Sequence, residues 1–434
     1  MSRASDAPSI WRNRGFLALW FGQAISETGS QVSFLAVPLT AIIVLHADAF
    51  QAGLLGTFQF APFLLVGLPA GVWVDRWRRR FVLIVADCGR LLALGSIPVA
   101  AQAGVLTLLQ LYVVAVISGV LTVFFDVAYQ SFLPALVSPD QLIDGNAKLS
   151  FTQSTAELVG PGLGGALVGA VGAARAVTVD AASYLVSVIS LLFVRGAREE
   201  VPDRATRRSL RIELGEGLRY VLGNPVLRSI AGCTGTVNFF IHLGMAVVIL
   251  YATNELHLTP AAIGLWFGLG GIGAPIGAVV AGRLARRFGT GPTITGIVWA
   301  TGWSWFLVVL APRASPLPWL IAAGVVGSFG GVVYNVTQVS LRQAITPHRL
   351  QGRMNASMRF LVWGTIPLGS FAGGVIGQAA GLRTALWISA AGALLASLWV
   401  SFGPVPRLRS AADAQRPEGN VYGVGLGGGP PTLI

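Results

Sequence analysis

Three carboxyl groups, those of Glu27, Asp126 and Glu157, lie within long apolar stretches of the sequence. On a helix that begins near residue 16, Glu27 lies roughly 18 Å in, close to the middle of an apolar membrane layer about 30 Å thick. An ionised carboxylate costs about 2.5–3.5 kcal/mol there, so it must face a cavity or a partner. Such a group can carry a proton or bind a cationic substrate. The alternative for each acid is a hydrogen bond or ion pair that only joins helices.

A second group of charges forms a turn between two apolar runs, Gly71-Val72-Trp73-Val74-Asp75-Arg76-Trp77-Arg78-Arg79-Arg80. One acid and four arginines within six residues would be costly in lipid, so the turn must lie at a membrane surface. A weaker copy, Gly282 to Gly289, follows 211 residues later. In this copy Arg286 stands at the place of Asp75, so any role of the acid belongs to the first copy.

The composition is that of a protein with many membrane-spanning helices. Of 434 residues, 54% are hydrophobic and 11% are charged, and 55 are glycines. Soluble domains carry about 25% charged residues, whereas Gly is frequent where membrane helices pack closely. Cys88 and Cys233 both lie in apolar runs, which predicts no disulfide framework.

Apolar stretches long enough to span a membrane predict an all-α polytopic membrane protein with 12 transmembrane helices. They fall near 16–45, 51–74, 81–103, 107–135, 148–171, 176–195, 227–252, 261–284, 291–312, 318–345, 355–379 and 383–403. The predicted layout is an N-terminal segment 1–15, a six-helix half 16–195, a central loop 196–226, a second six-helix half 227–403 and a tail 404–434. Helical spacing of apolar residues from 210 to 222 predicts an amphipathic helix on the membrane surface, and the Pro- and Gly-rich tail is predicted to be disordered.

The basic residues predict the orientation. Most of the 30 lysines and arginines fall in the loops on the side of the N-terminus. The opposite loops carry Arg175, Arg313 and Arg383. This asymmetry predicts that both termini lie in the cytoplasm, and it accounts for the net charge of +12 without nucleic acid. Lys148 is the single lysine, a bias that favours a bacterial source and hence a bacterial cell membrane.

The two predicted halves share a sequence repeat. The segment 159–165 aligns with 368–374, and Asn146-Ala147 aligns with Asn355-Ala356, both at a shift of 209 residues. Two six-helix halves of parallel topology, related by a pseudo-two-fold axis, are typical of alternating-access transporters whose site lies between the halves.

With these motifs in order, the sequence resembles the major facilitator superfamily, and within it the exporter branch that includes enterobactin exporters and macrolide efflux proteins. The superfamily pattern Gly-x-x-x-Asp-Arg-x-Gly-Arg-Arg is matched by Gly71, Asp75, Arg76, Arg79 and Arg80, while Arg78 replaces the second Gly. The exporter pattern Gly-x-x-x-Gly-Pro-x-x-Gly-Gly is matched by Gly160, Pro161, Gly164 and Gly165, while Ala156 replaces the first Gly. The segments 19–23, 129–134 and 180–184 also have the look of this branch, and the resemblance covers about residues 12 to 403.

The resemblance implies two gates. The acid of the turn, Asp75, would contact the start of the helix near 353–358 and help to close the cytoplasmic side. The Gly-Pro pattern around Gly160 would seal the extracellular side and mark an exporter. The alternatives are a loop that only fixes topology and ordinary packing of small residues.

Further polar residues lie on the predicted helices that line the superfamily's cavity. They are Gln31, Asn238, His242, Asn335 and Gln338. Each is a candidate for substrate or proton binding, and each could instead form an interhelical hydrogen bond worth about 0.6 kcal/mol. Asp87 and Arg90, three residues apart, predict an intrahelical ion pair. Asp180, near the start of its helix and the outer surface, is predicted to be structural.

The sequence therefore predicts a proton-coupled exporter of small amphipathic molecules, such as a siderophore or a drug-like natural product. The alternatives are an importer or an uncoupled facilitator and, from a different class, a non-transporting membrane receptor. The sequence has no metal-ligand cluster, nucleophile triad or Gly-Lys-Ser/Thr phosphate loop, so we expect neither an enzyme nor a metal or cofactor. The expected partners are a small-molecule substrate, protons and membrane lipid, with the protein acting as a monomer.

Overall fold

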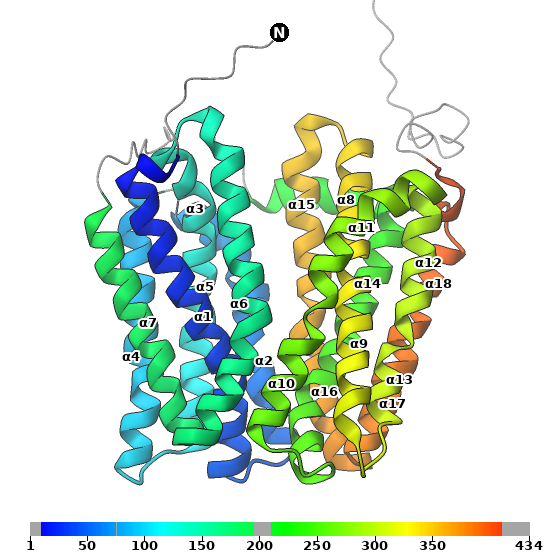
Figure 1. The fold of residues 1–434 in the computed structure, drawn as a ribbon. Helices are drawn as coiled ribbons and strands as arrows, with labels where there is room; N and C mark the ends of the chain where they lie inside the picture. The colour runs from blue at the N-terminus through cyan, green and yellow to red at the C-terminus, as the bar shows by residue number, and fades with distance from the viewer. Residues whose placement is uncertain (1–9, 75, 195–209, 410–434) are drawn as a thin grey trace, which may run out of the picture.

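The computed structural model describes residues 10–74, 76–194 and 210–409, and these residues form helices without any strand (Figure 1). The first half contains α1 (Arg14–Leu39), α2 (Ala49–Leu65), α3 (Gly67–Val74), α4 (Arg79–Gln102), α5 (Leu108–Leu136), α6 (Leu142–Val171) and α7 (Ala173–Phe193). The helix α8 (Leu210–Gly223) lies between the halves in sequence. The second half contains α9 (Pro225–Asn254), α10 (Pro260–Gly270), α11 (Gly273–Phe288), α12 (Thr290–Gly302), α13 (Ser304–Val309), α14 (Pro316–Ile345), α15 (His348–Trp363), α16 (Thr365–Ala380), α17 (Leu382–Leu395) and α18 (Ser397–Ser401).

The described part of the chain has 10 helical spans that are long and apolar enough to cross a membrane. Several of them join two consecutive helices, such as α10 with α11 and α15 with α16. The remaining two predicted crossings fall on α2, a shorter apolar helix that α3 continues, and on α6, whose 30 residues include three charged ones. The chain is thus an all-α multi-pass membrane protein, and its helices are consistent with the twelve predicted crossings.

The repeat extends to the backbone of the first loop in each half. His46 and His257, 211 residues apart, have φ angles of 52° and 51°. Positive φ is uncommon outside glycine, so the same turn has been kept in both copies. Two residues later in each loop, Asp48 and Thr259 cap the next helices, α2 and α10, by accepting hydrogen bonds from backbone N–H groups. Each cap fixes the residue at which the following helix begins.

A second pair of turns repeats at the other shift. Gly172 and Gly381, 209 residues apart, have φ angles of 88° and 91°, and each separates two long helices directly. Gly adopts this left-handed conformation without the steric cost of a Cβ atom, so the chain can reverse within one residue. The described residues of the two halves are therefore two copies of one topology.

The halves share a hydrophobic core at one end of the molecule and separate toward the other. The largest cluster combines residues from Val32 to Ala181 in the first half with residues from Leu243 to Leu386 in the second. Near the N-terminus each half has its own core, one drawn from residues 19–194 and one from residues 221–408. Figure 1 shows the two groups of helices joined at the bottom, with the N-terminus at the top.

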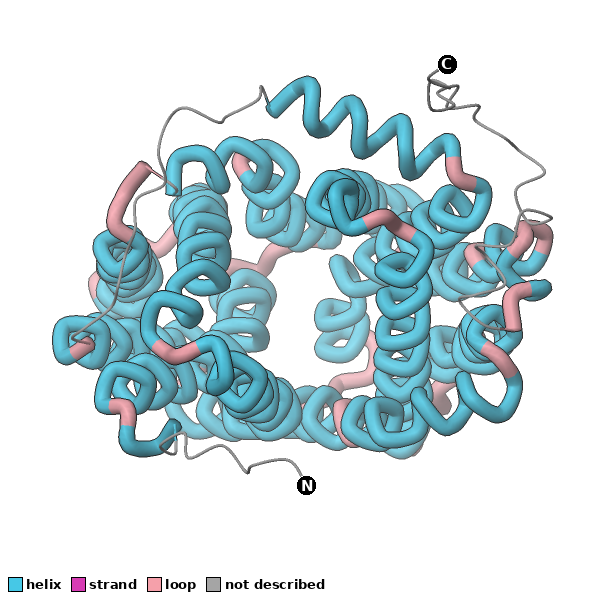
Figure 2. Tube along the Cα trace, turned by 90° about the horizontal axis from the view of Figure 1, so that it is seen from above, coloured by secondary structure: helices cyan, strands magenta, loops and turns pink. Residues whose placement is uncertain are grey.

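The helix α8 and the start of the tail both belong to the second half. The predicted amphipathic segment 210–222 forms α8, which packs against α15 and α9 and runs along one edge of the molecule (Figure 2). The first residues of the tail are ordered, contrary to the prediction, with a 3-10 helix at Val405–Arg407. The backbone N–H groups of Thr290 and Gly291 donate to the carbonyls of Arg409 and Leu408. These bonds satisfy the first groups of α12, which explains why the order extends past residue 404. Residues 1–9, 195–209 and 410–434 lie outside the described residues, and with them parts of the predicted terminal segments and central loop.

Candidate functional site

The three carboxyl groups predicted from the sequence lie on three neighbouring helices of the first half. Glu27 on α1 is close enough to interact electrostatically with both Asp126 on α5 and Glu157 on α6. Gln23, one turn before Glu27, donates a hydrogen bond of 2.7 Å from Nε2 to Glu27 Oε1. Gln153 donates to Glu157 Oε1 in the same way at 3.1 Å. The structure therefore joins residues 130 positions apart in sequence into one acidic wall.

Asp126 lies between two arginines that come from opposite directions. Arg90, on α4 of the same half, interacts with it electrostatically, and so does Arg359, on α15 of the other half. Because Glu27 also acts on Asp126, the charge state of this carboxyl group depends on three elements in both halves. Asp126 is thus the point at which the acidic wall faces the second half.

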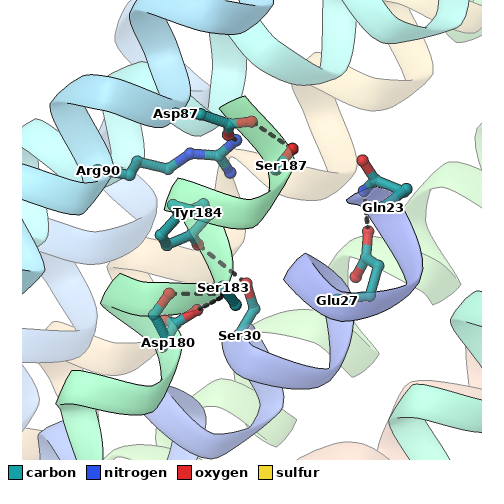
Figure 3. Close-up of polar contacts among 9 residues, drawn as sticks. All are labelled: Gln23, Glu27, Ser30, Asp87, Arg90, Asp180, Ser183, Tyr184 and Ser187. Carbon is teal, nitrogen blue, oxygen red and sulfur yellow. Dashed lines mark hydrogen bonds and ion pairs between the residues drawn. The ribbon is translucent and has the colours of Figure 1, made fainter. Parts of the chain in front are cut away.

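Behind Asp126, a buried network holds Arg90 in place (Figure 3). Arg90 forms the predicted intrahelical ion pair with Asp87, which confirms that expectation. Ser187 on α7 donates a hydrogen bond of 2.6 Å from Oγ to Asp87 Oδ2. The guanidinium group lies 4.3 Å from the ring centre of Phe125 and 4.5 Å from that of Tyr184. Asp87 and Arg90 are 0% and 6% exposed, so this pair is fully inside the first half.

Asp180 belongs to the same buried region. The sequence placed it near the start of its helix at the outer surface, but the structure starts α7 earlier, at Ala173, and buries Asp180 to 1% exposure. The positive φ of Gly172 explains the difference, because it allows α7 to begin directly after α6. Ser183 Oγ donates to the backbone carbonyl of Asp180 at 2.7 Å and to Asp180 Oδ1 at 3.3 Å.

Aromatic contacts connect the two halves beside the acidic wall. The ring of His242 on α9 lies 5.2 Å from that of Phe60 on α2, and Trp363 on α15 lies 5.4 Å from Phe63 on α2. Arg359 stands over the Trp363 ring at 5.0 Å. The sequence analysis did not select Arg359, Phe60, Phe63 or Trp363 as site residues. An arginine inside the apolar stretch 355–379 was the available signal for this second wall.

The polar candidates of the second half mostly bond within that half. Asn238 Nδ2 donates to the backbone carbonyl of Val362 at 3.2 Å, which links α9 to α15. Gln338 Nε2 donates to Asn335 Oδ1 at 3.1 Å on α14, and Gln338 is 3% exposed. These contacts favour the structural alternative for Asn238 and Gln338. Asn335 and the half-buried His242 keep polar atoms toward less covered space.

The Gly-Pro pattern on α6 provides space for α1. A Cβ atom added at Gly160 would lie 2.3 Å from Gln31 Cβ, and one at Gly164 would lie 3.1 Å from Val32 Cα. Neither distance is available to a real side chain, so both glycines are needed for the close approach of α1. Gln31 packs on Gly160 and is half-buried.

The same pattern forms one of two crossings between the halves. A Cβ atom at Gly165 on α6 would lie 2.7 Å from Gly264 Cα on α10. On the other side, a Cβ atom at Gly53 on α2 would lie 2.5 Å from Gly374 Cα on α16. Gly264 follows Gly53 by 211 residues and Gly374 follows Gly165 by 209, so the repeat relates the two crossings. Backbone touches backbone at both places, at the end of the molecule where the halves share a core.

The charged turn that precedes α4 lies at the opposite end. Asp75 lies outside the described residues, so its contacts stay a prediction. Arg80 donates from Nε to the Leu191 carbonyl at 2.9 Å and from Nη2 to the Leu192 carbonyl at 2.8 Å. Arg80 therefore binds carbonyl groups in the last turn of α7, where a cation is favourable. Arg76 is exposed and Arg79 is half-buried.

The predicted target of the turn has another partner in this structure. Arg353 Nη1 on α15 pairs with Glu216 Oε2 on α8 at 2.5 Å. A Cβ atom at Gly217 would lie 2.5 Å from the Arg353 carbonyl oxygen, so α8 packs tightly on α15. Gly71, the first residue of the turn motif, has open space around it.

Comparison with known families identifies this architecture. A family model described as transmembrane secretion effector matches residues 5–421, which is nearly the whole chain. The chain belongs to this family. It is thus a transporter of the major facilitator superfamily, which confirms the resemblance drawn from its motifs.

Curated relatives of this family member include efflux proteins. The multidrug efflux pump Tap of Mycolicibacterium fortuitum is 26% identical over 411 residues, covering 92% of this chain and 98% of its own length. The enterobactin exporter EntS of Salmonella typhi is 27% identical over 348 residues, covering 78% and 80%. Among solved structures, a bacterial homologue of the iron transporter ferroportin in its inward-facing state gives a TM-score of 0.73 at 19% identity, covering 90% and 98%. This last likeness concerns the fold alone.

Proposed function

We propose that this transporter exports small amphipathic molecules from the cytoplasm in exchange for protons, by alternating access. The observation that carries the proposal is the electrostatic contact of Glu27 with Asp126 and Glu157 at membrane depth. Like charges at this range repel each other, so a proton or a cationic group bound among them is stabilised. Glu27, which interacts with both other acids, is the proposed coupling residue. Substrate and protons would bind the same wall in turn.

The direction of transport is argued from orientation and relatives. With both termini in the cytoplasm, the end at which the halves have separate cores faces the cytoplasm. A substrate would then reach the acidic wall from inside the cell. Tap and EntS are by name an efflux pump and an exporter, which supports outward movement. Import and uncoupled facilitation are the alternatives that experiment must separate.

Two gates would alternate around this wall. The crossings Gly165–Gly264 and Gly53–Gly374 would form the outer seal, which must open to release substrate. The turn from Gly71 to Arg80 would form the inner latch, with Asp75 reaching residues 353–358 once the cytoplasmic ends approach. Ion pairing of Arg353 with Glu216 would then have to coexist with this latch or give way to it.

The proposed substrates are siderophores or drug-like natural products, and the proposed active unit is a monomer in a bacterial cytoplasmic membrane. The substrate would first be sought by comparing the accumulation of siderophores, macrolides and dyes in cells with and without the gene. A compound excluded only from the expressing cells would then serve as the transport probe.

The decisive experiment measures uptake of that probe into inside-out membrane vesicles energised with a proton gradient. We expect uptake to collapse when an uncoupler is added, and Glu27→Gln to abolish the proton-driven part. Glu255→Gln is the matched control, because Glu255 lies in the loop before α10 and faces Arg313 at 3.7 Å, away from the wall. Uptake that ignores the uncoupler would replace the proposal with a facilitator, and a fully active Glu27→Gln variant would remove Glu27 from the coupling step.

A further inference from the structure

Arg359 is an exposed cation at membrane depth. It lies eleven residues into the continuous span His348–Ala380, roughly 17 Å from its start at about 1.5 Å per residue. A charged side chain costs about 2.5–3.5 kcal/mol at the centre of a lipid bilayer, so it must face water or a partner. The exposure of Arg359 therefore needs an explanation that lipid cannot give.

Within the described residues, Arg359 forms neither an ion pair nor a hydrogen bond, and its printed contact is the ring of Trp363 at 5.0 Å. The other arginine at this depth, Arg90, is buried and paired with Asp87. A guanidinium group has five N–H donors in a planar fork, so those of Arg359 are available to a ligand. This contrast separates a structural arginine from one that is poised to bind.

Arg359 is directed toward the other half of the transporter. It interacts electrostatically with Asp126 across the boundary between the halves, and its neighbour Trp363 contacts Phe63 of the first half. The cytoplasmic ends of the two halves have separate cores, so this boundary is where a substrate can enter. The two walls have opposite charge, with three acids on one side and Arg359 on the other.

We propose that Arg359, with the Trp363 ring beside it, binds the carboxylate of an amphipathic substrate whose opposite end is cationic or apolar. A planar guanidinium group pairs with a carboxylate through two parallel hydrogen bonds. The Trp363 ring supplies a flat apolar surface next to that pair. A substrate that is anionic at both ends would be repelled by Glu27, Asp126 and Glu157, so the two walls select a molecule with one acidic end. This inference rests on the proposed transport of amphipathic molecules and names their chemical class.

Binding of rhodamine B and of its ethyl ester tests the proposal directly. Both have the same cationic ring system, but only rhodamine B carries a free carboxylate. Affinities would be measured by fluorescence anisotropy with the full-length protein in lipid nanodiscs, where no proton gradient is present. We expect the wild-type protein to prefer rhodamine B, and Arg359→Gln to weaken rhodamine B binding by about 10-fold to 100-fold, as for loss of a charged hydrogen-bonded pair. Binding of the ester should change less than twofold.

Two variants control for structural damage. Arg349→Gln removes the same charge from the exposed start of α15 and should leave both affinities unchanged. Arg359→Lys keeps the charge without the planar fork and should restore part of the preference. The proposal is overturned if the wild-type protein lacks a preference for rhodamine B, or if Arg359→Gln weakens both dyes equally. Because binding needs no gradient, loss of the uncoupler effect would refute proton coupling while leaving this binding result intact.

Discussion

The close crossing of α6 and α10 makes a sharp prediction for Gly264→Ala. A Cβ atom at this position would lie 2.5 Å from the Pro161 carbonyl oxygen and 2.8 Å from Gly165 Cα. Both neighbours are backbone atoms, so no side chain can rotate away to make room. Ordinary contact begins at 3.4 Å, so the two helices must separate by about 0.9 Å at this point. The substitution therefore acts on the contact between the halves.

The size of the effect follows from the cost of overpacking. An extra methyl group in a tight interface typically costs about 1–3 kcal/mol. The cost applies to the state in which this end is closed, because the crossing is absent once the halves separate there. A bias of that size changes the ratio of the two states by about 5-fold to 150-fold. We expect Gly264→Ala to populate the state that is open at this end.

Spin labels on the loops at this end can measure the change. Val105 lies between α4 and α5 and Ala314 lies between α13 and α14, and both are exposed. With Cys88 and Cys233 replaced, Val105→Cys and Ala314→Cys would carry the labels, and double electron–electron resonance would report their distance distribution. In Gly264→Ala the longer-distance component should grow.

Gly162→Ala provides the matched control for this experiment. Gly162 also lies on α6, but a Cβ atom there would meet nothing within 4 Å. The control should therefore keep the wild-type distances and gain helix propensity instead. Unchanged distances in Gly264→Ala, or the same shift in Gly162→Ala, would refute the argument that the backbone crossing holds this end closed.

Two further predictions concern ion pairs of very different burial. Arg90→Gln leaves Asp87 buried without its cation, so we expect a loss of about 3–5 kcal/mol in stability, measured as a lower unfolding temperature in detergent. The double variant Asp87→Asn with Arg90→Gln should recover part of that loss, and equal damage in both would contradict the ion-pair explanation. Glu216→Gln breaks the partly exposed pair with Arg353, for which a double-mutant cycle should give a coupling of at most about 1 kcal/mol. A much larger coupling would mean that this pair controls the position of α8.

The sequence predicted those features that depend on local pattern. Apolar stretches of membrane length gave the helices, because each must satisfy its own backbone in lipid. The acids Glu27, Asp126 and Glu157 could be selected because charge is rare and costly at that depth. The pair Asp87–Arg90 could be predicted because three residues bring side chains together on one helix.

Other features depend on contacts that no local pattern encodes. Gly53 and Gly264 belong to no motif in the sequence analysis, although each lies at a crossing between the halves. Their significance depends on which helix lies opposite, which is a property of the whole fold. Arg359 was visible as a charge inside a helix, but its orientation toward Asp126 required the arrangement of both halves. Asp180 was placed too near the surface because the tight turn at Gly172 was not recognised.

The repeat also explains why the two walls differ in charge. Counting by the repeat shifts, Glu27 corresponds to Asn238 at 211 residues and Asp126 corresponds to Asn335 at 209. Both acids of the first half thus become neutral amides in the second, which can bond as Asn238 does to the Val362 carbonyl without carrying charge. Arg359 reverses the relation, since the matching position in the first half is a serine. The crossings could stay symmetric because they use only backbone and glycine. Charge could diverge because a substrate with unlike ends is held in one orientation only when the walls are unlike.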